Sequence, residues 1–474
     1  MMLSTGFAFL LYGWTLAPGI TWAHHGADGS ELIAAAITNG VPHPPGYPLY
    51  IMLLQGWLAL WGKMMPASDL GWRANLLSAV LAALSVGVTV LTSAGLLRER
   101  SYRWWWAMVA GVAWATSPLL WSQAIITEVY ALHALLVALL GWALLTRPHQ
   151  PWWLLPITAL AVANHLTYLL LMPAALYAYW SVDGDARWAH LRVALAAFGI
   201  GALLGALFYV RIPVVATAAP PAAINWGYAD NLPDFLWLVS GSAYRSYLFG
   251  VPTDQLFQRV AGWANTIVFQ LTPVGLAFAM LGLAHLDIHQ PRLRTLGLLW
   301  VLPISLYSIV YYTRDSEIYL LALVWMMIVW LTMGLIASAD WLQVRMPAAR
   351  REAMPALATK LVLGGSLAAL LLLAGFHWPA TSLRTDSAAV EYLEAVGDVI
   401  EPGSIIVTMG DQKTFALWYG NWGNRELAQI APDLVIVNDS LYQFAWYRRL
   451  LSQLYPHVPN VDQSVQALIA GNQG

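Results

Sequence analysis

The stretch RANLLSAVLAALSVGVTVLTSAGLLRERSYR, residues 73–103, joins an apolar run over 73–97 to a basic cluster over 98–103. As a helix rising about 1.5 Å per residue, the run is long enough to cross a hydrocarbon core of about 30 Å. Basic residues directly after such a run are typical of the cytoplasmic side. The stretch therefore predicts a membrane-spanning helix that ends in the cytoplasm.

Similar runs recur through the chain of 474 residues. Hydrophobic residues make up 59% and charged residues only 10%, less than half of the about 25% usual in soluble proteins. This composition excludes a soluble globular protein and predicts a polytopic α-helical membrane protein with eleven spans. We expect the spans near 3–19, 73–97, 104–121, 123–146, 151–164, 166–180, 189–211, 263–286, 295–313, 317–339 and 357–377.

Segment 46–62 is barely long enough to span, and its alternative is a helix lying along the interface. If segment 46–62 is interfacial and 151–180 is a helical hairpin, the inner loops contain twice as many basic residues as the outer loops. If 46–62 spans the membrane and 151–180 is one long helix, the two numbers are nearly equal. The positive-inside rule favours the first topology, with the N-terminus in the cytoplasm. The outer face would then carry 20–72, 119–130, 212–262, 313–317 and the C-terminal tail.

The tail has a different composition, so we divide the chain into a membrane domain, 1–379, and an extracytoplasmic α/β domain, 380–474. Helices are expected at 386–400, 412–419 and 442–454, and strands at 404–409 and 434–438. Cysteine is absent and the net charge is -2, which excludes disulfides, thiolate chemistry and a basic field for nucleic acid.

The first outer loop, WAHHGADGSELIAAAITNGVPHPPGYPLY (22–50), gathers carboxylates and histidines at the membrane surface. Asp28 and Glu31 have the spacing of a capping box, which needs no catalysis. Equally, a carboxylate here can be a general base that takes a proton from an acceptor hydroxyl. The run from His43 to Tyr47 cannot be helical, because its prolines lack donors and restrain their predecessors. It predicts a rigid turn that holds His43 toward the site.

Further polar side chains lie in apolar surroundings on the same expected side. Glu128 and His133 fall in SPLLWSQAIITEVYALHALL (117–136), near one helical face, and Asn164-His165 marks the tip of the hairpin. A structural alternative for Glu128 is that it is solvated or paired with an arginine. The alternative for Asn164-His165 is that these residues only satisfy the helix break. The remaining candidates for binding the substrate are Arg211, Tyr244, Arg245, Arg314 and Asp315. An arginine among them would hold a lipid phosphate, although snorkelling or ion pairing explains any single arginine.

At these residues the chain resembles a family of transmembrane proteins related to a protein O-mannosyltransferase, within the GT-C class of membrane glycosyltransferases. The resemblance rests on TLAPGITWAHHGADGSELIAAA (15–36), GVPHPPGYPLY (40–50), SPLLWSQAIITEVYALHALL (117–136) and NHLTYLLLMP (164–173), with weaker similarity at 224–244 and 314–321. It implies a GT-C fold in which the first outer loop bears a catalytic Asp and two helices lie along the membrane.

By position, the resemblance implies that Asp28 is the general base and Glu31 its neighbour, with Glu128 and His165 supporting the site. The family motif reads Asp-Ser-Gly-Glu, whereas this chain has the two middle residues transposed, as Gly29-Ser30. Both carboxylates stay in register.

The resulting hypothesis is an inverting transferase in the plasma membrane. It would move a sugar, mannose by resemblance, from polyprenyl phosphate to a hydroxyl acceptor such as protein Ser or Thr. No cofactor is required, although a divalent cation at Asp28 and Glu31 remains an alternative. The competing hypotheses are transfer to a glycolipid or cell-wall polymer, and a transporter or lipid-binding protein that uses the same carboxylates.

Overall fold

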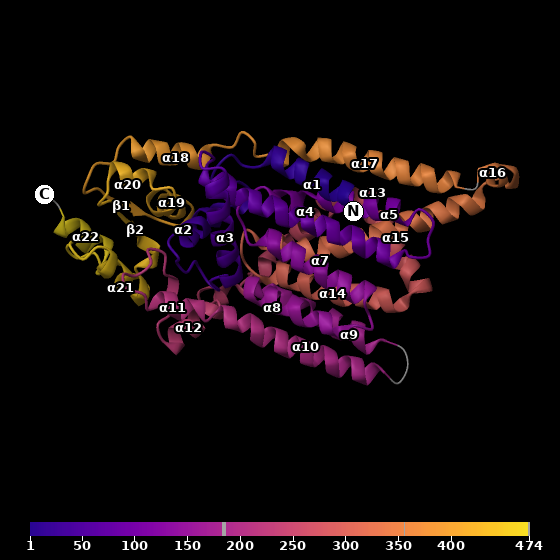
Figure 1. Cartoon of the computed structure of the whole chain (residues 1–474), viewed down its shortest axis with the longest axis horizontal. Helices are drawn as coiled ribbons and strands as arrows, with labels where there is room; N and C mark the ends of the chain where they lie inside the picture. The colour runs from indigo at the N-terminus through magenta and orange to yellow at the C-terminus, as the bar shows by residue number, and fades with distance from the viewer. Residues whose placement is uncertain (183–185, 355, 473–474) are drawn as a thin grey trace.

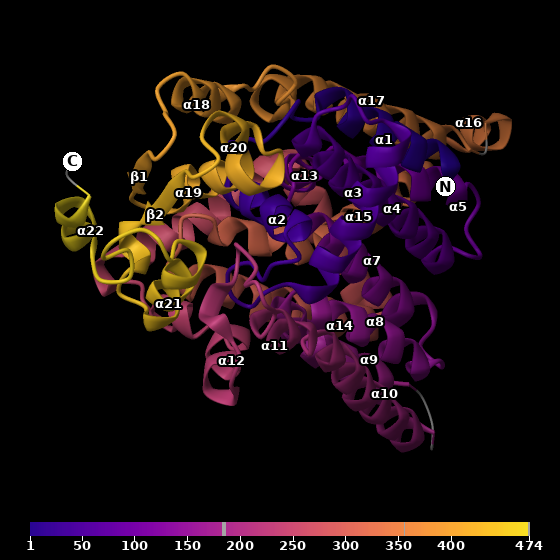
Figure 2. The ribbon, with the colours of Figure 1, turned by 60° about the vertical axis from the view of Figure 1, so that its left-hand side comes forward.

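The computed structural model describes residues 1–182, 186–354 and 356–472. Long helices lie side by side along the longest axis, and the C-terminal elements gather at one end beside α2 (Figures 1 and 2). The helices up to the end of the bundle are α1 (Met2–Thr15), α2 (Ala27–Ile37), α3 (Pro48–Met64), α4 (Leu70–Leu96), α5 (Arg103–Ala115), α6 (Pro118–Ala124), α7 (Tyr130–Thr146), α8 (Leu154–Asn164), α9 (Met172–Trp180), α10 (Arg187–Phe208), α11 (Arg211–Ala216), α12 (Leu232–Val239), α13 (Leu256–His289), α14 (Pro291–Val310), α15 (Leu321–Arg345), α16 (Ala348–Ala353) and α17 (Leu357–Thr381).

The bundle has the composition of a multi-pass membrane protein. Among the described residues, six helical segments are long and apolar enough to cross a bilayer, and α7 and 166–180 are shorter apolar helices. The polytopic architecture is confirmed, while the count of eleven crossings stays a prediction. The six segments are Leu70–Leu96, Arg187–Ala216, Thr253–His289, Pro291–Val310, Ser316–Arg345 and Leu357–Thr381.

Two of the expected spans have different boundaries. The run 104–121 divides into α5 and α6 before Pro118, because a proline disfavours helical geometry in the residue that precedes it. The expected helix 123–146 begins only at Tyr130, as α7. Glu128 therefore lies in a turn before α7, and the prediction that it shares a helical face with His133 is wrong.

The predicted break in 151–180 is confirmed at His165. Its backbone is extended, with φ -152° and ψ 123°, between α8 and the 3-10 helix η3 (Leu166–Leu171). The His165 Nδ1 atom accepts a hydrogen bond from the Thr167 N–H at 3.3 Å, which caps the segment that follows. A second break, in α13, has no predicted counterpart and occurs at Thr272, before Pro273.

The C-terminal elements contain both predicted strands together with helices, and the two strands pair in parallel. Strand β1 (Ile405–Thr408) pairs with β2 (Val435–Asn438), and Thr408 lies opposite Asn438. Helix α19 packs directly on α2 of the first loop. The helices of this part are α18 (Ala388–Gly397), α19 (Asp411–Trp418), α20 (Glu426–Ile430), α21 (Ala445–Leu454) and α22 (Val465–Gly471), of which α20 and α22 were not predicted.

Two hydrogen bonds tie the first loop to this C-terminal part, and a third ties it to the end of α17. The Thr21 hydroxyl donates to Asp386 at 2.7 Å, and the Trp22 indole N–H donates to the Gln412 carbonyl at 3.1 Å. The His24 Nε2 atom lies 2.9 Å from the Thr381 carbonyl at the end of α17. These contacts hold the start of α2 between the membrane helices and the C-terminal elements.

Candidate active site

The first turn of α2 carries both predicted carboxylates, but they do not form a capping box. The helix begins after Gly26, without a side-chain cap, and Asp28 lies inside it. Residues three apart share a helical face, so Asp28 and Glu31 are neighbours. The Asp28 side chain is 40% exposed, whereas that of Glu31 is fully buried. The two carboxylates therefore have different surroundings and suit different roles.

His43 links the two carboxylates. Its Nδ1 atom lies 2.5 Å from Glu31 Oε2, and its Nε2 atom lies 3.6 Å from Asp28 Oδ2. Its backbone N–H also donates to Glu31 Oε1 at 3.3 Å. Burial lowers the pKa of His43, but Asp28 and Glu31 outweigh this effect and raise it to about 10. At neutral pH an imidazolium therefore lies between two carboxylates.

The electrostatic balance at Asp28 is different. Burial raises the pKa of this carboxyl to about 6, and His43 partly offsets the effect by attracting the charged form. The nearby charges of Glu31 and Asp315 raise the pKa further. A carboxylate with a pKa near the working pH combines an ionised ground state with useful basicity.

The loop that carries His43 is fixed by close backbone contacts. The Val41 N–H donates to the Ile224 carbonyl at 2.8 Å, and the Trp226 N–H donates to the Val41 carbonyl at 3.1 Å. A Cβ atom at Gly40 would lie 2.3 Å from the Ile224 carbonyl oxygen, so only glycine permits this approach. The pairing brings Trp226 within 6.3 Å of the His43 ring, measured between ring centroids.

Glu128 reaches the same site from the turn before α7. A Cβ atom at Gly29 would lie 2.6 Å from the Thr127 carbonyl oxygen, so α2 packs directly against this turn. Glu128 is 3% exposed and accepts a hydrogen bond from the Val129 N–H at 3.3 Å. Burial and the charge of Asp28 both raise its pKa. The prediction that Asp28 and Glu128 meet at one end of the bundle agrees with this geometry.

Histidine and tyrosine rings surround His165 next to this cluster. Its ring centroid lies 5.4 Å from those of Tyr130 and His133, 5.9 Å from Tyr47 and 6.0 Å from Tyr319. His133 Nδ1 is buried without a hydrogen-bond partner among the described residues. Tyr319 was not predicted, since one tyrosine in an apolar run carries no signal of its own.

Asn164 and Tyr244 also border the site. The Asn164 amide donates to the Val129 carbonyl at 3.3 Å, while its Oδ1 atom is buried without a partner in the described structure. Burial, followed by the charges of Asp28 and Glu31, raises the pKa of Tyr244. Both predicted residues therefore lie near the carboxylates.

The predicted arginines differ in their surroundings. Arg211 donates to the Gly40 carbonyl at 2.9 Å and to Asn39 Oδ1 at 2.8 Å, so it braces the first loop. Arg245 is exposed and donates to Ser240 at 3.2 Å. Arg314 is exposed beside Asp315, whose charge acts on Asp28. Of the three, Arg314 is the one whose neighbour in the chain acts electrostatically on Asp28.

Arg259 positions the turn that carries Arg314 and was not predicted. Its guanidinium donates to the carbonyls of Ser308 and Tyr311 at 2.8 and 2.7 Å, and to that of Thr313 at 3.1 Å. Arginine with five donors suits this role, because it satisfies several carbonyls of one turn at once. Its position in the sequence gives no sign of these distant partners.

The C-terminal part contributes two further residues that were not predicted as site residues. The Phe415 ring is nearly parallel to that of His43, with centroids 6.5 Å apart and an angle of 11°. Asp411 lies one turn earlier on α19, and burial, followed by the charge of Asp28, raises the pKa of its carboxyl. Asp411 is the first residue of α19, which has no side-chain cap.

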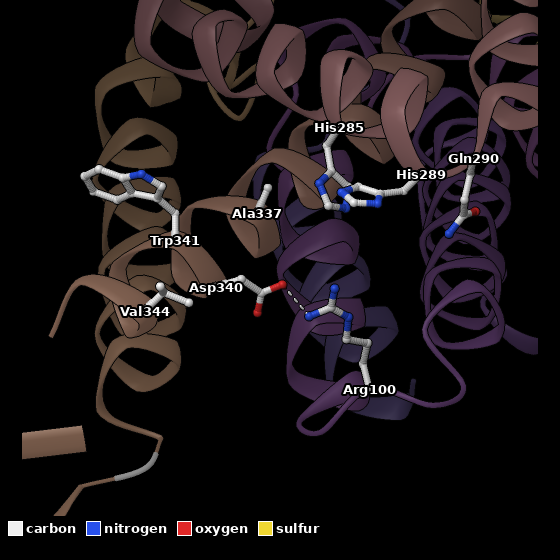
Figure 3. A pocket seen from close by; sticks show the side chains of 8 residues that line it. All are labelled: Arg100, His285, His289, Gln290, Ala337, Asp340, Trp341 and Val344. Atoms are coloured by element: carbon white, nitrogen blue, oxygen red, sulfur yellow. Dashed lines mark hydrogen bonds and ion pairs between the residues drawn. The ribbon is translucent and has the colours of Figure 1, made fainter. Parts of the chain in front are cut away.

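A cavity of about 580 Å³ lies elsewhere, near the C-terminal ends of α13 and α15. Figure 3 shows the ion pair between Arg100 and Asp340 in it, with Nη1 and Oδ2 2.5 Å apart, and the side chains of His285 and His289 nearby. None of the predicted site residues lines this cavity. The candidate active site is instead the cluster of Asp28, Glu31 and His43, which does not border this cavity.

The site does not have the usual form of a metal centre. Among the described residues, no group of three or more His, Asp or Glu side chains is arranged to hold an ion. Between Asp28 and Glu31, the position of a cation is taken by the ring of His43.

Comparisons with known proteins agree with these features. The family model described as Protein O-mannosyl-transferase TMEM260 N-terminal domain matches residues 28–211, and TMEM260-associated domain 2 matches residues 385–467. The chain is 23% identical over 305 residues to the protein O-mannosyl-transferase tmem260 of Dictyostelium discoideum, covering 58% of this chain and 35% of that protein. It is 35% identical over 115 residues to mouse TMEM260, covering 24% and 15%. The matched part is thus about a third or less of the length of these relatives.

Solved structures of ArnT, a GT-C protein from Cupriavidus metallidurans, share the fold. The undecaprenyl phosphate complex gives a TM-score of 0.54 at 11% identity, and the apo form gives 0.52 at 12%. Each comparison covers 93% of this chain and 90% of the other. The two family models together match more than half of the residues, and they include the loop that carries Asp28. The chain therefore belongs to the GT-C membrane protein family related to the protein O-mannosyl-transferase TMEM260.

Proposed function

We propose that this chain is an inverting glycosyltransferase that moves mannose from a polyprenyl-phosphate carrier to a Ser or Thr hydroxyl of a protein. The reaction would take place at the outer face of the plasma membrane. The observation that carries the proposal is the arrangement of Asp28, His43 and Glu31, in which a partly exposed carboxylate lies beside a buried imidazolium. The names of the TMEM260 relatives support the sugar and the acceptor class.

The donor is a lipid, which suits the surface of the bundle. Helices α10, α13 and α17 expose large apolar side chains, including Leu203, Ile288 and Phe376. A polyprenyl tail can pack along such helices while its phosphate stays near the polar end of the bundle. The related ArnT structure with undecaprenyl phosphate supports this class of carrier.

Asp28 acts as the general base in the proposed reaction. The acceptor O–H proton passes to the Asp28 carboxylate as the oxygen forms a bond to the anomeric carbon. The bond from this carbon to the phosphate oxygen breaks on the opposite face, and the configuration inverts. Polyprenyl phosphate leaves as an anion, so its departure needs positive charge more than a proton donor.

His43 and Arg314 are the proposed sources of that positive charge. Glu31 is buried and bound to His43, so we assign it a positioning role in place of direct catalysis. It fixes the orientation of the ring and favours the imidazolium. Because the His43 ring lies between the two carboxylates and offsets part of their charge, the proposed mechanism assigns no step to a divalent cation.

The test is transfer by the purified protein in lipid nanodiscs, with polyprenyl-phosphate mannose and a Thr-containing acceptor. We expect release of polyprenyl phosphate with mannosylation of the acceptor. In Asp28→Asn, kcat/KM should fall by about 10² to 10⁴, which is the usual contribution of a general base. Asp254→Asn is the matched control, since Asp254 is exposed on the 3-10 helix η6 (Thr253–Gln255).

The other outcomes distinguish the competing hypotheses. Donor turnover with a glycolipid or polymer acceptor, but never with protein, would redirect the proposal to that acceptor class. Movement of the lipid-linked sugar across a bilayer without transfer, undiminished in Asp28→Asn, would support a transporter. Equal turnover by Asp28→Asn and the wild type would contradict the assigned base.

A further inference from the structure

The wall of the site that faces away from the membrane helices is formed by two aromatic rings. The centroids of Phe415 and Trp226 lie 6.4 Å apart, and each ring lies within 6.5 Å of the His43 ring. Phe415 comes from α19, and Trp226 comes from the 3-10 helix η4 (Trp226–Tyr228). The wall therefore combines the outer segment of the membrane domain with the C-terminal part.

Segment 226–230 is firmly attached to α21 of the C-terminal part. Asp230 Oδ2 lies 2.7 Å from Arg449 Nη2, and the Arg449 guanidinium lies 4.0 Å from the Tyr228 ring centroid. The Tyr228 hydroxyl also donates to Gln453 at 2.5 Å. These contacts join the segment that carries Trp226 to the C-terminal part that carries Phe415, through charged and aromatic pairs.

Two polar groups of this wall have no partner within the described structure. Trp226 is 5% exposed, and its indole N–H makes no hydrogen bond. A buried indole N–H usually has a partner, so this donor is available to a ligand. The Asp411 carboxylate is exposed and makes no hydrogen bond or ion pair with the described residues. It lies one helical turn before Phe415 on the same face of α19.

The lipid donor and the water-soluble acceptor would approach Asp28 from opposite sides, and the wall lies on the side of the acceptor. A polyprenyl donor reaches Asp28 from the side of the membrane helices. The C-terminal elements lie beyond that end of the bundle, next to α2 (Figure 2). A water-soluble acceptor reaches Asp28 from the side of the C-terminal elements, and it meets α19 and Trp226 first.

We propose that Asp411 and Trp226 bind the acceptor, with the carboxylate accepting a hydrogen bond from it and the indole N–H donating one to it. This inference rests on the proposed function, and it makes the C-terminal part a component of the active site. Asp411 is an acceptor-binding residue here, and Asp28 remains the base that removes the hydroxyl proton. Phe415 is a positioning residue that packs on His43.

The kinetic test compares Asp411→Asn and Trp226→Phe with the wild type, using polyprenyl-phosphate mannose and a threonine-rich peptide. Asp411→Asn keeps the shape of the side chain and replaces one acceptor oxygen by an amide group. Trp226→Phe keeps an aromatic ring, removes the indole N–H and reduces the volume of the side chain. We expect the KM for the peptide to rise about tenfold, equivalent to about 1.4 kcal/mol, while the KM for the donor stays unchanged. The matched controls are Asp398→Asn, in an exposed position after α18, and Trp105→Phe, in an exposed position on α5.

A binding measurement separates this inference from the proposed function. Anisotropy of the fluorescein-labelled peptide reports binding without turnover, and its threonine-to-valine counterpart tests the need for hydroxyl groups. Binding by the wild type that weakens about tenfold in both variants supports the acceptor wall, even if no mannose is transferred. Absence of binding by the wild type, a rise in donor KM instead of peptide KM, or equal effects in the control variants would overturn it.

Discussion

Replacement of His43 by Gln tests the electrostatics of the site most directly. The base must be ionised to act, so kcat/KM of the wild type should fall about tenfold for each pH unit well below the Asp28 pKa of about 6. The imidazolium, with Nε2 3.6 Å from Asp28 Oδ2, favours the charged carboxylate and lowers this pKa. His43→Gln removes that attraction. The acidic limb of the pH profile should therefore move to higher pH.

The size of the movement follows from the exposure of Asp28. An opposite charge within about 4 to 6 Å shifts a carboxyl pKa by about 1 to 3 units. Because the Asp28 side chain is 40% exposed and water screens part of the interaction, we expect the lower end, about 1 unit. By this effect alone, kcat/KM at pH 7 should fall about twofold in the variant, because about half of the Asp28 carboxyls would then be protonated, and it should recover as the pH rises.

The assay is the dependence of kcat/KM on pH at saturating acceptor, with unfolding temperature measured in parallel. His149→Gln makes the same chemical change at an exposed position on the loop between α7 and α8, and it should leave the profile unchanged. A folded His43→Gln protein whose acidic limb stays near pH 6, or moves lower, would refute the assigned electrostatic role.

Other changes test the packing and the chemistry of the site. Gly29→Ala should lower the free energy of unfolding by about 1 to 3 kcal/mol, because the added Cβ would collide with Thr127. Thermal unfolding measures the effect. The control is Gly56→Ala, since a Cβ at Gly56 would point into open space. Arg259→Lys should lower the free energy of unfolding by about 1.5 to 3 kcal/mol, because it removes hydrogen bonds to the turn before η7 (Ser316–Leu320). The freed turn should raise the KM for the donor. An unchanged KM would contradict this role. Chelation with EDTA should leave transfer unchanged, and loss of activity restored by a divalent ion would contradict the metal-free mechanism.

Apolar length and composition predicted most of the architecture. The runs that became α4, α15 and α17 carry strong signals, because their length and hydrophobicity need no tertiary partner to be recognised. The same approach missed the break before α7, where apolar residues continue through a turn. A window of hydropathy cannot distinguish a helix from a buried turn, because both are apolar.

The site was partly predictable because its carboxylates and histidine lie in one short loop. The spacing of Asp28 and Glu31 also fitted a capping box, and the structure shows that Glu31 bonds to His43 instead. A local pattern cannot identify a partner twelve positions away across a proline turn. Asp411 and Trp226 were harder still, since only the packing of distant segments brings them to the same end.

The hydrogen bonds that join Thr21, Trp22 and His24 to residues between 381 and 412 have a consequence for biogenesis. These pairs are separated by 365, 390 and 357 positions in the sequence. During synthesis these contacts of the first loop can therefore form only after α17 and the segment that follows it have been made. A polypeptide that stalls before α17 would lack the contacts that hold the start of α2, and we expect it to lack the arrangement proposed for catalysis.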